Sequence, residues 1–119
     1  MTPDVPSPED TPGFAGGQVV TVFRSRRRPG TEDRYGPLAD AMLAAARARP
    51  GLVDFSIFES PDGERVSLVT FDSPETHAAW RDDPHHRTAQ RQGQDELYDE
   101  YSVQVSLCTG ATRWHRRTD

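Results

Sequence analysis

The sequence predicts an α+β fold of the ferredoxin-like type, with the element order β-α-β-β-α-β and a four-stranded antiparallel sheet. Two kinds of pattern predict it. A run with helical spacing lies between the first two candidate strands, and two consecutive helix starts lie between the last two. The four candidate strands, which are rich in β-branched and aromatic residues or alternate apolar with polar residues, are 18–26, 52–60, 64–72 and 101–108.

The first half of the pattern is a strand followed by a helix. The strand QVVTVFRSR (18–26) ends before the turn RPG, and Thr31 then has the chemistry of a helix N-cap. Acidic residues follow it in the first turn, where the helix dipole favours them. Apolar residues recur at helical spacing until Pro50-Gly51 ends the run. They are Tyr35, Leu38, Met42, Ala45 and Ala46.

The second half is a hairpin, a helix in two parts and a final strand. The turn PDG (61–63) joins LVDFSIFES (52–60) to ERVSLVTFD (64–72). Ser73-Pro74 and Asp83-Pro84 each place an N-cap residue before a proline at the first helical position, so we expect the second helix to be interrupted at the second of these pairs. In YSVQVSLC (101–108), apolar residues alternate with polar ones, which predicts the last strand.

In this arrangement both helices cover one face of the sheet and leave the other face bare. A bare apolar sheet face is unusual on a small soluble monomer. We therefore expect a second copy of the chain to cover it, which makes the protein a homodimer.

The length and composition limit the chain to one small domain. With 119 residues, we expect a single folded unit over residues 18–108. Residues 1–17 contain four prolines and three glycines with almost nothing to bury, so we expect a disordered leader. Residues 109–119 are short of apolar residues and locally basic, and we interpret them as a C-terminal tail.

Charge and cysteine content exclude several classes of protein. A net charge of −5 argues against nucleic-acid binding, because that affinity comes mainly from neutralising phosphates. The single Cys108 excludes an internal disulfide and most zinc sites. No stretch approaches the roughly 20 apolar residues of a membrane span, and no signal peptide is visible. We predict a soluble, cytoplasmic protein with no nucleic-acid or membrane partner.

Three segments resemble the antibiotic biosynthesis monooxygenase (ABM) family. They are the first strand running into RPG, the segment ARPGLVDFSIFES, and the segment LVTFDS…AAWRDDPHHRTAQRQG, and the resemblance covers residues 18–108. It implies a dimeric α+β barrel of two ferredoxin-like protomers, each with a pocket between sheet and helices. Some relatives oxygenate aromatic polyketide anthrones without metal or flavin, and others bind and degrade haem.

The haem-degrading branch of this family has three residues that the present chain replaces. Its asparagine on the first strand corresponds to Phe23 and its strand tryptophan to Phe71. With Trp80 as the anchor of the alignment, its haem-ligating histidine corresponds to Gln90, whose amide oxygen is a poorer haem ligand than imidazole nitrogen. The resemblance therefore implies no cofactor, and a pocket between Phe23 and Phe71 that suits a flat apolar ligand.

Two adjacent histidines follow the Asp83-Pro84 pair. Neighbouring helical residues point about 100° apart, so His85 and His86 cannot grip one metal ion from a regular helix, and we expect no metal site. Cofactor-free oxygenation needs a base that takes a phenolic or carbon-bound proton, and imidazole suits that role at neutral pH. We predict that His86 is this base and that Gln90, on the same helical stripe, orients oxygen or substrate. The alternative is a half-buried His86 that bonds to the backbone or to Tyr98.

The resulting hypothesis is a cofactor-independent monooxygenase that acts with dioxygen on an aromatic, polyketide-like or quinol substrate. Two alternatives stay open: a non-catalytic dimer that binds a small molecule in the same pocket, and a cofactor-free cyclase or isomerase. The predicted substrate-binding residues are Phe23, Phe55, Phe71, Trp80 and Tyr98.

Overall fold

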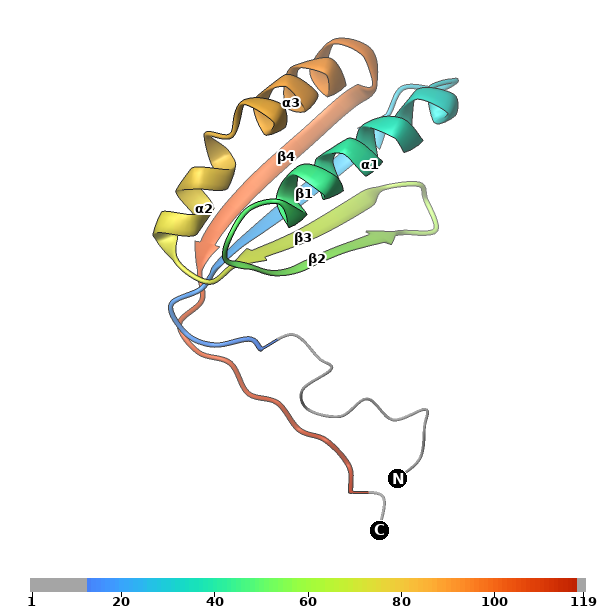
Figure 1. The fold of residues 1–119 in the computed structure, drawn as a ribbon. Coiled ribbons are helices and arrows are strands. Elements are labelled where there is room, and N and C mark those ends of the chain that lie inside the picture. The colour runs from blue at the N-terminus through green and yellow to red at the C-terminus, as the bar shows by residue number, and fades with distance from the viewer. Residues whose placement is uncertain (1–12, 118–119) are drawn as a thin grey trace.

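The computed structural model describes residues 13–117 and confirms the predicted α+β fold and element order (Figure 1). Four strands form one antiparallel sheet in the order β2-β3-β1-β4, and the helices lie against one of its faces. The elements are β1 (Val19–Arg27), α1 (Glu32–Arg47), β2 (Leu52–Glu59), β3 (Arg65–Phe71), α2 (Pro74–Arg81), α3 (Pro84–Glu96) and β4 (Tyr98–Leu107).

The core between sheet and helices consists of two separate clusters of buried side chains. One joins α1 to α3 and to the start of β4, and it consists of Tyr35, Leu38, Ala89 and Leu97. The other lies where β3 meets α2 and the end of α1, and it consists of Ala46, Val69, Phe71 and Trp80. Residues of both clusters line a cavity between them, so the core encloses the site described below.

The helices α2 and α3 each begin at an N-cap of their own, as the sequence predicts. Ser73 begins α2 with a reciprocal capping box in which its hydroxyl accepts from the N–H of Thr76. The carboxylate of Asp83 begins α3 by accepting from the N–H groups of His85 and His86 at 2.9 and 3.2 Å. Two short helices therefore replace one long one, and the second takes its own direction along the sheet (Figure 1).

Two local features differ from the sequence-based expectation. Thr31 is the N-cap residue of α1 as predicted, but its hydroxyl donates to the carbonyl of Arg28 and makes no capping hydrogen bond to the helix. The last strand begins at Tyr98 rather than at residue 101, because a register shift beside Arg26 lets Arg27 pair with Tyr98. Asp99 and Glu100 break the apolar alternation there, so the sequence pattern did not reveal the earlier start.

The sheet face opposite the helices is uncovered. Phe58 of β2 lies on this face and exposes 57% of its surface, and the half-buried side chains of Val22 and Leu68 accompany it from the two central strands. On β4, at the edge of the sheet, Val105 and Leu107 are also exposed although they point to the helix side. The apolar surface is thus larger than this single chain can bury.

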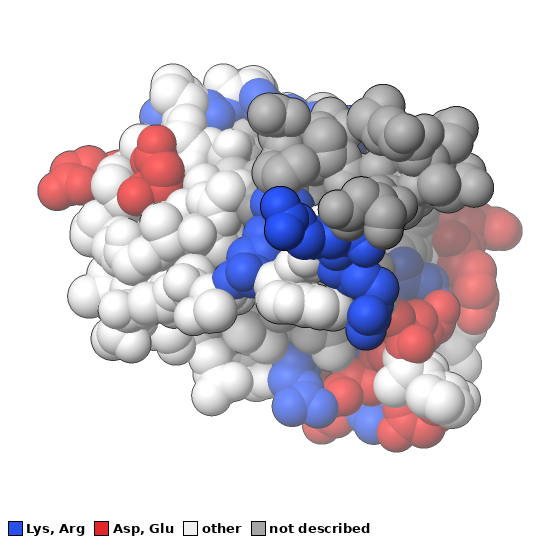
Figure 2. Space-filling view, turned by 90° about the horizontal axis from the view of Figure 1, so that it is seen from below, with Lys and Arg blue, Asp and Glu red and all other residues white. Residues whose placement is uncertain are grey.

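Both ends of the described chain leave the sheet at the same side (Figure 1). Residues 1–12 of the predicted leader lie outside the described residues, and the next residues are held by Gln18, whose side chain bonds to the backbone of Gly13 and Ala15. Basic side chains gather at this end (Figure 2), where the exposed segment 109–117 carries three arginines. Within residues 13–117, no helix is long and apolar enough to cross a membrane.

Candidate functional site

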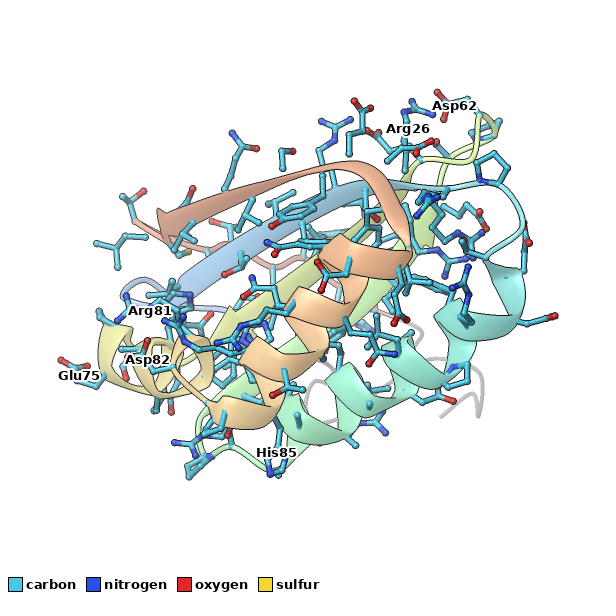
Figure 3. The ribbon with its side chains drawn as sticks, turned by 90° about the horizontal axis from the view of Figure 1, so that it is seen from above. Arg26, Asp62, Glu75, Arg81, Asp82 and His85 are labelled. Atoms are coloured by element: carbon cyan, nitrogen blue, oxygen red, sulfur yellow. The ribbon has the colours of Figure 1, made fainter. Side chains whose placement is uncertain are left out.

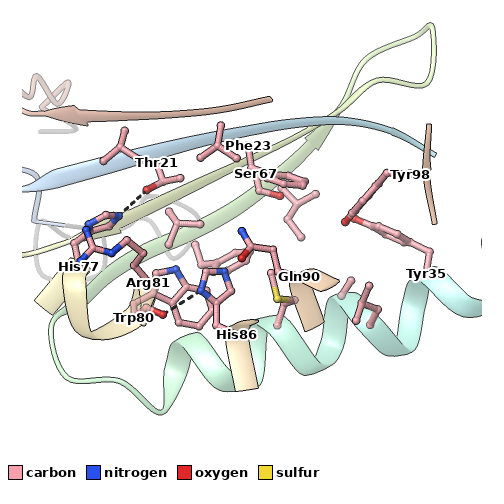
Figure 4. Close-up of a pocket in the computed structure, with 18 residues that line it drawn as sticks. Thr21, Phe23, Tyr35, Ser67, His77, Trp80, Arg81, His86, Gln90 and Tyr98 are labelled. Carbon is pink, nitrogen blue, oxygen red and sulfur yellow. Dashed lines mark hydrogen bonds between the residues drawn. The ribbon is translucent and has the colours of Figure 1, made fainter. Parts of the chain in front are cut away.

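A cavity of about 220 Å³ lies between the sheet and the three helices (Figure 4). Its volume is below the usual range of about 300–1,000 Å³ for small-molecule sites, so it suits a compact ligand. Most of the wall is apolar, with contributions from Phe23, Leu38, Met42, Phe55, Val69 and Val105. The polar groups that reach it are Thr21, Tyr35, His77, His86, Gln90 and Tyr98, and Ser67 and Arg81 also line it.

The cavity brings together six of the seven residues that the sequence assigned to the site. His86 and Gln90 of α3 line it with Trp80 of α2, and the remaining three, Phe23, Phe55 and Tyr98, come from strands. Their roles in binding or catalysis stay predictions.

Phe71 was expected in the wall, and this was wrong. Its side chain is fully buried and lies outside the cavity lining. At the end of β3 the ring lies against Trp80 and His77, which line the cavity, with 6.0 and 6.5 Å between the ring centroids. Phe71 therefore stabilises the core that supports the wall.

His86 is held in a defined orientation by Trp80. The imidazole stacks on the indole with 3.8 Å between ring centroids and 12° between planes, and Nδ1 lies 3.0 Å from the carbonyl oxygen of Trp80. A carbonyl oxygen only accepts hydrogen bonds, so Nδ1 carries the proton in this contact. In the neutral ring, Nε2 then has a free lone pair, and this nitrogen makes no hydrogen bond to any of residues 13–117.

The surroundings of His86 favour its neutral form. Burial lowers the pKa of His86, and this outweighs the hydrogen bond to Trp80 and the nearby charge of Asp83, which act in the opposite direction. The imidazole therefore carries a free lone pair at neutral pH, which is the state that a general base requires. The structure therefore contains the half-buried, backbone-bonded His86 that the sequence offered as the alternative, and the hydrogen bond to Trp80 fixes the orientation of the imidazole.

Gln90 lies one turn after His86 on α3, and Figure 4 shows its amide directed into the cavity. The side chain is half-buried and forms no hydrogen bond with the part of the chain that the structure describes. Both ends of the amide are thus available to a ligand, as a donor and as an acceptor.

The sequence did not identify a second histidine in the cavity. His77 of α2 is buried, and its Nε2 lies 3.3 Å from the hydroxyl oxygen of Thr21 on β1. Burial lowers the pKa of His77, and the neighbouring charge of Arg81 acts in the same direction. The i, i+3 spacing of His77 and Trp80, which puts both on one helical face, was the available signal.

The sequence of this chain matches a known protein family. The family model for the antibiotic biosynthesis monooxygenase family matches residues 18–92. The chain belongs to this family. A comparison with curated proteins finds no match.

Solved structures with the ABM fold superpose on most of this chain. The protein Rv0793 of Mycobacterium tuberculosis is 26% identical, covers 81% of this chain with 99% of its own length, and superposes with a TM-score of 0.71. A putative antibiotic biosynthesis monooxygenase of Nitrosomonas europaea is 17% identical, with coverages of 82% and 99% and a TM-score of 0.69. SnoaB of Streptomyces nogalater, described as a cofactor-independent oxygenase, is 12% identical, with coverages of 80% and 96% and a TM-score of 0.69.

Other charged and histidine side chains of this ABM domain lie outside the cavity. His85 is exposed on the outer side of the helix layer (Figure 3). Arg24 and Arg26 point to the other face of the sheet, where they pair with Glu64 at 2.7 Å and with Asp62 at 2.8 Å. These arginines therefore stabilise the β2–β3 hairpin end and do not reach a ligand in the cavity.

Among residues 13–117, no group of three or more His, Cys, Asp or Glu side chains is arranged to hold a metal ion. The resemblance to haem-degrading relatives aligns Gln90 with their haem-ligating histidine, and an amide oxygen is a poor haem ligand.

Proposed function

We propose that this chain is a cofactor-independent monooxygenase that oxidises a compact aromatic substrate with dioxygen. The observation that carries the proposal is the anchored, neutral imidazole of His86, which leaves Nε2 as an unpaired acceptor on a mostly apolar cavity. A base in such a wall can take a proton from a weakly acidic C–H or O–H group, because the product is a delocalised anion that tolerates low polarity.

The proposed reaction needs no external reductant, because the substrate supplies all the electrons that reduce dioxygen. His86 Nε2 takes a proton from an activated CH₂ group, and the electron pair of that bond spreads over the aromatic ligand. One electron passes to dioxygen, and recombination of the two radicals forms a C–O bond and a peroxide. The imidazolium protonates the peroxide. Loss of water, with the second hydrogen of the carbon, then leaves a ketone, so one oxygen atom enters the product and the other leaves as water.

Relatives support this assignment by analogy. SnoaB carries the description of a cofactor-independent oxygenase, and its fold is shared over most of both chains. At 12% sequence identity the comparison supports a shared fold but not the roles of individual residues. The support for the chemistry therefore comes from the cavity of this chain.

The test is oxygen uptake with an anthrone, which carries an activated CH₂ group, measured with an electrode. We expect uptake by the unmodified protein, a loss of about 10²–10⁴-fold in His86→Ala, and no loss in His85→Ala. His85 is the matched control, because it is the adjacent histidine and is exposed on the outer side of the same helix. Equal activity of the two variants would show that His86 is not the base.

The same assay separates the alternative functions. Turnover that continues under strict anaerobiosis would exclude an oxygenase and indicate a cyclase or isomerase. Ligand binding without turnover, seen by calorimetry, would indicate a binding protein that lacks the chemistry.

We also propose that a second copy of this chain covers the open sheet face. The exposed Phe58 and its half-buried apolar neighbours support it, since such a face is unfavourable in water. Phe58→Glu should then shift the mass measured by light scattering from dimer to monomer, whereas an unmodified protein that is already monomeric would contradict the proposal.

A further inference from the structure

Two tyrosines form one end of the cavity. Tyr35 of α1 is buried, Tyr98 begins β4, and both line the cavity at the end away from His77 (Figure 4). The Tyr35 hydroxyl lies beside the guanidinium of Arg65, which can only donate, so neither tyrosine hydroxyl has an acceptor for its own proton in residues 13–117. Buried polar groups normally have partners, so two donors that open into a cavity point to an acceptor on a ligand.

The guanidinium groups of Arg27 and Arg65 contact the ring of Tyr35. The Cζ atoms of Arg27 and Arg65 lie 4.5 and 4.4 Å from the centroid of its ring. Both arginines share one acidic partner, Glu59, at 3.8 and 3.6 Å, so this group of side chains carries an excess of positive charge. A cation against the ring withdraws electron density from the phenol, which strengthens its O–H as a donor.

Both phenols keep their protons at neutral pH. Burial raises the pKa of Tyr98 to about 12. Burial also raises the pKa of Tyr35, although the charge of Arg65 acts against this increase. The two hydroxyls are thus donors under ordinary conditions, and the neighbouring arginines supply charge without reaching the cavity lining themselves.

The position of Tyr98 is set by a glycine. A Cβ atom on Gly93 of α3 would lie 2.6 Å from Cε2 of Tyr98, which is closer than any ordinary contact. The helix therefore accommodates the tyrosine ring only because residue 93 has no side chain.

We propose that Tyr35 and Tyr98 form an oxyanion site that binds the phenolate or enolate oxygen of a flat aromatic ligand. Two neutral donors suit an oxygen whose charge is shared with a ring. A carboxylate, in contrast, prefers bidentate contact with a guanidinium, and Arg27 and Arg65 face the ring of Tyr35 instead of the cavity. The guanidinium of Arg81 does line the cavity, but it lies at the opposite end, beside His77, and pairs with Asp82 at 3.2 Å (Figure 4). This inference deepens the proposed function and takes the aromatic ligand from it: when the base removes a proton, the electron pair moves to the oxygen held by the tyrosines.

The test measures binding by calorimetry with the full chain and needs no turnover. The probe is 4-nitro-1-naphthol above its own pKa, compared with 1-nitronaphthalene, which lacks the oxygen. We expect the unmodified protein to bind the naphtholate at least about tenfold more tightly. Tyr35→Phe and Tyr98→Phe should each weaken naphtholate binding about tenfold and leave 1-nitronaphthalene unchanged.

Tyr101→Phe is the matched control, because the Tyr101 hydroxyl accepts a hydrogen bond from Gln94 and its side chain lies outside the cavity lining. This variant should bind both probes as the unmodified protein does, and thermal unfolding checks that all three variants are folded. Equal loss for both probes, or no loss in either cavity variant, would overturn the oxyanion site. Tighter binding of 1-naphthoate, with the same dependence on the two tyrosines, would overturn the assignment to a phenolate. A protein that binds the naphtholate as expected but consumes no oxygen would refute only the proposed reaction.

Discussion

Gly93 lies against the ring of Tyr98, so the effect of Gly93→Ala on the free energy of unfolding should depend on whether that ring is present. Gly93→Ala adds a methyl group inside α3, where the preference of helices for alanine favours the folded state by about 1 kcal/mol. The same methyl group would lie 2.6 Å from Cε2 and 3.2 Å from Cδ2 of Tyr98, and overpacking of this kind costs about 1–3 kcal/mol. The free energy of unfolding should therefore stay level or fall by up to about 2 kcal/mol.

The background Tyr98→Ala removes the ring and leaves room for the methyl group. In that background Gly93→Ala should stabilise the protein by up to about 1 kcal/mol, because only the helix preference remains. The difference between the two backgrounds is a coupling energy of about 1–3 kcal/mol, which corresponds to at least about 4 °C in the unfolding midpoint of a domain of this size.

Urea and thermal unfolding followed by circular dichroism measure all four members of this cycle. The single variant Gly93→Ala should also weaken naphtholate binding, because the displaced ring moves the Tyr98 hydroxyl. If Gly93→Ala stabilises both backgrounds equally, the tyrosine does not lie against residue 93, and the position assigned to its hydroxyl is wrong.

Three further outcomes follow from the caps and the buried groups. Ser73→Ala removes the capping box of α2 and should cost about 1 kcal/mol in urea unfolding, whereas an unchanged midpoint would contradict the cap. Burial lowers the pKa of His77 and His86, so below about pH 6.5 the unfolded chain binds more protons than the folded one. Stability should fall as the pH drops from about 6.5 through the lower folded-state pKa values, and the urea midpoint at pH 5 and pH 7 measures this. Absorbance titration at alkaline pH should show one tyrosine that ionises near pH 12 and is missing in Tyr98→Phe.

The order of the elements could be predicted because each boundary has a local chemical cause. Proline and N-cap residues mark both parts of the second helix, and alternation marks the strands. His86 and Gln90 could be predicted for the same reason, since the helical start at Asp83 determines which face each residue occupies.

The rest of the site depends on packing that no local pattern encodes. Phe71 and Phe23 both alternate toward the helices, and only the position of Trp80 decides that the first is core and the second is cavity wall. The helical spacing predicted Tyr35 only as an apolar residue facing the core. The role of its hydroxyl could not be predicted, because it depends on Tyr98, which lies far along the chain and lines the same end of the cavity. Sequence therefore predicted the elements, and contacts between distant segments determined the polar ends of the cavity.

The proline after Asp83 does more than begin a helix. In an uninterrupted helix the carbonyl of Trp80 would accept from the N–H of residue 84, but proline has no such hydrogen. That oxygen instead accepts from the N–H of Asp83 and from Nδ1 of His86, which uses both of its lone pairs. The proline thus leaves the Trp80 carbonyl available to Nδ1 of His86, and this hydrogen bond fixes the tautomer in which Nε2 is unprotonated.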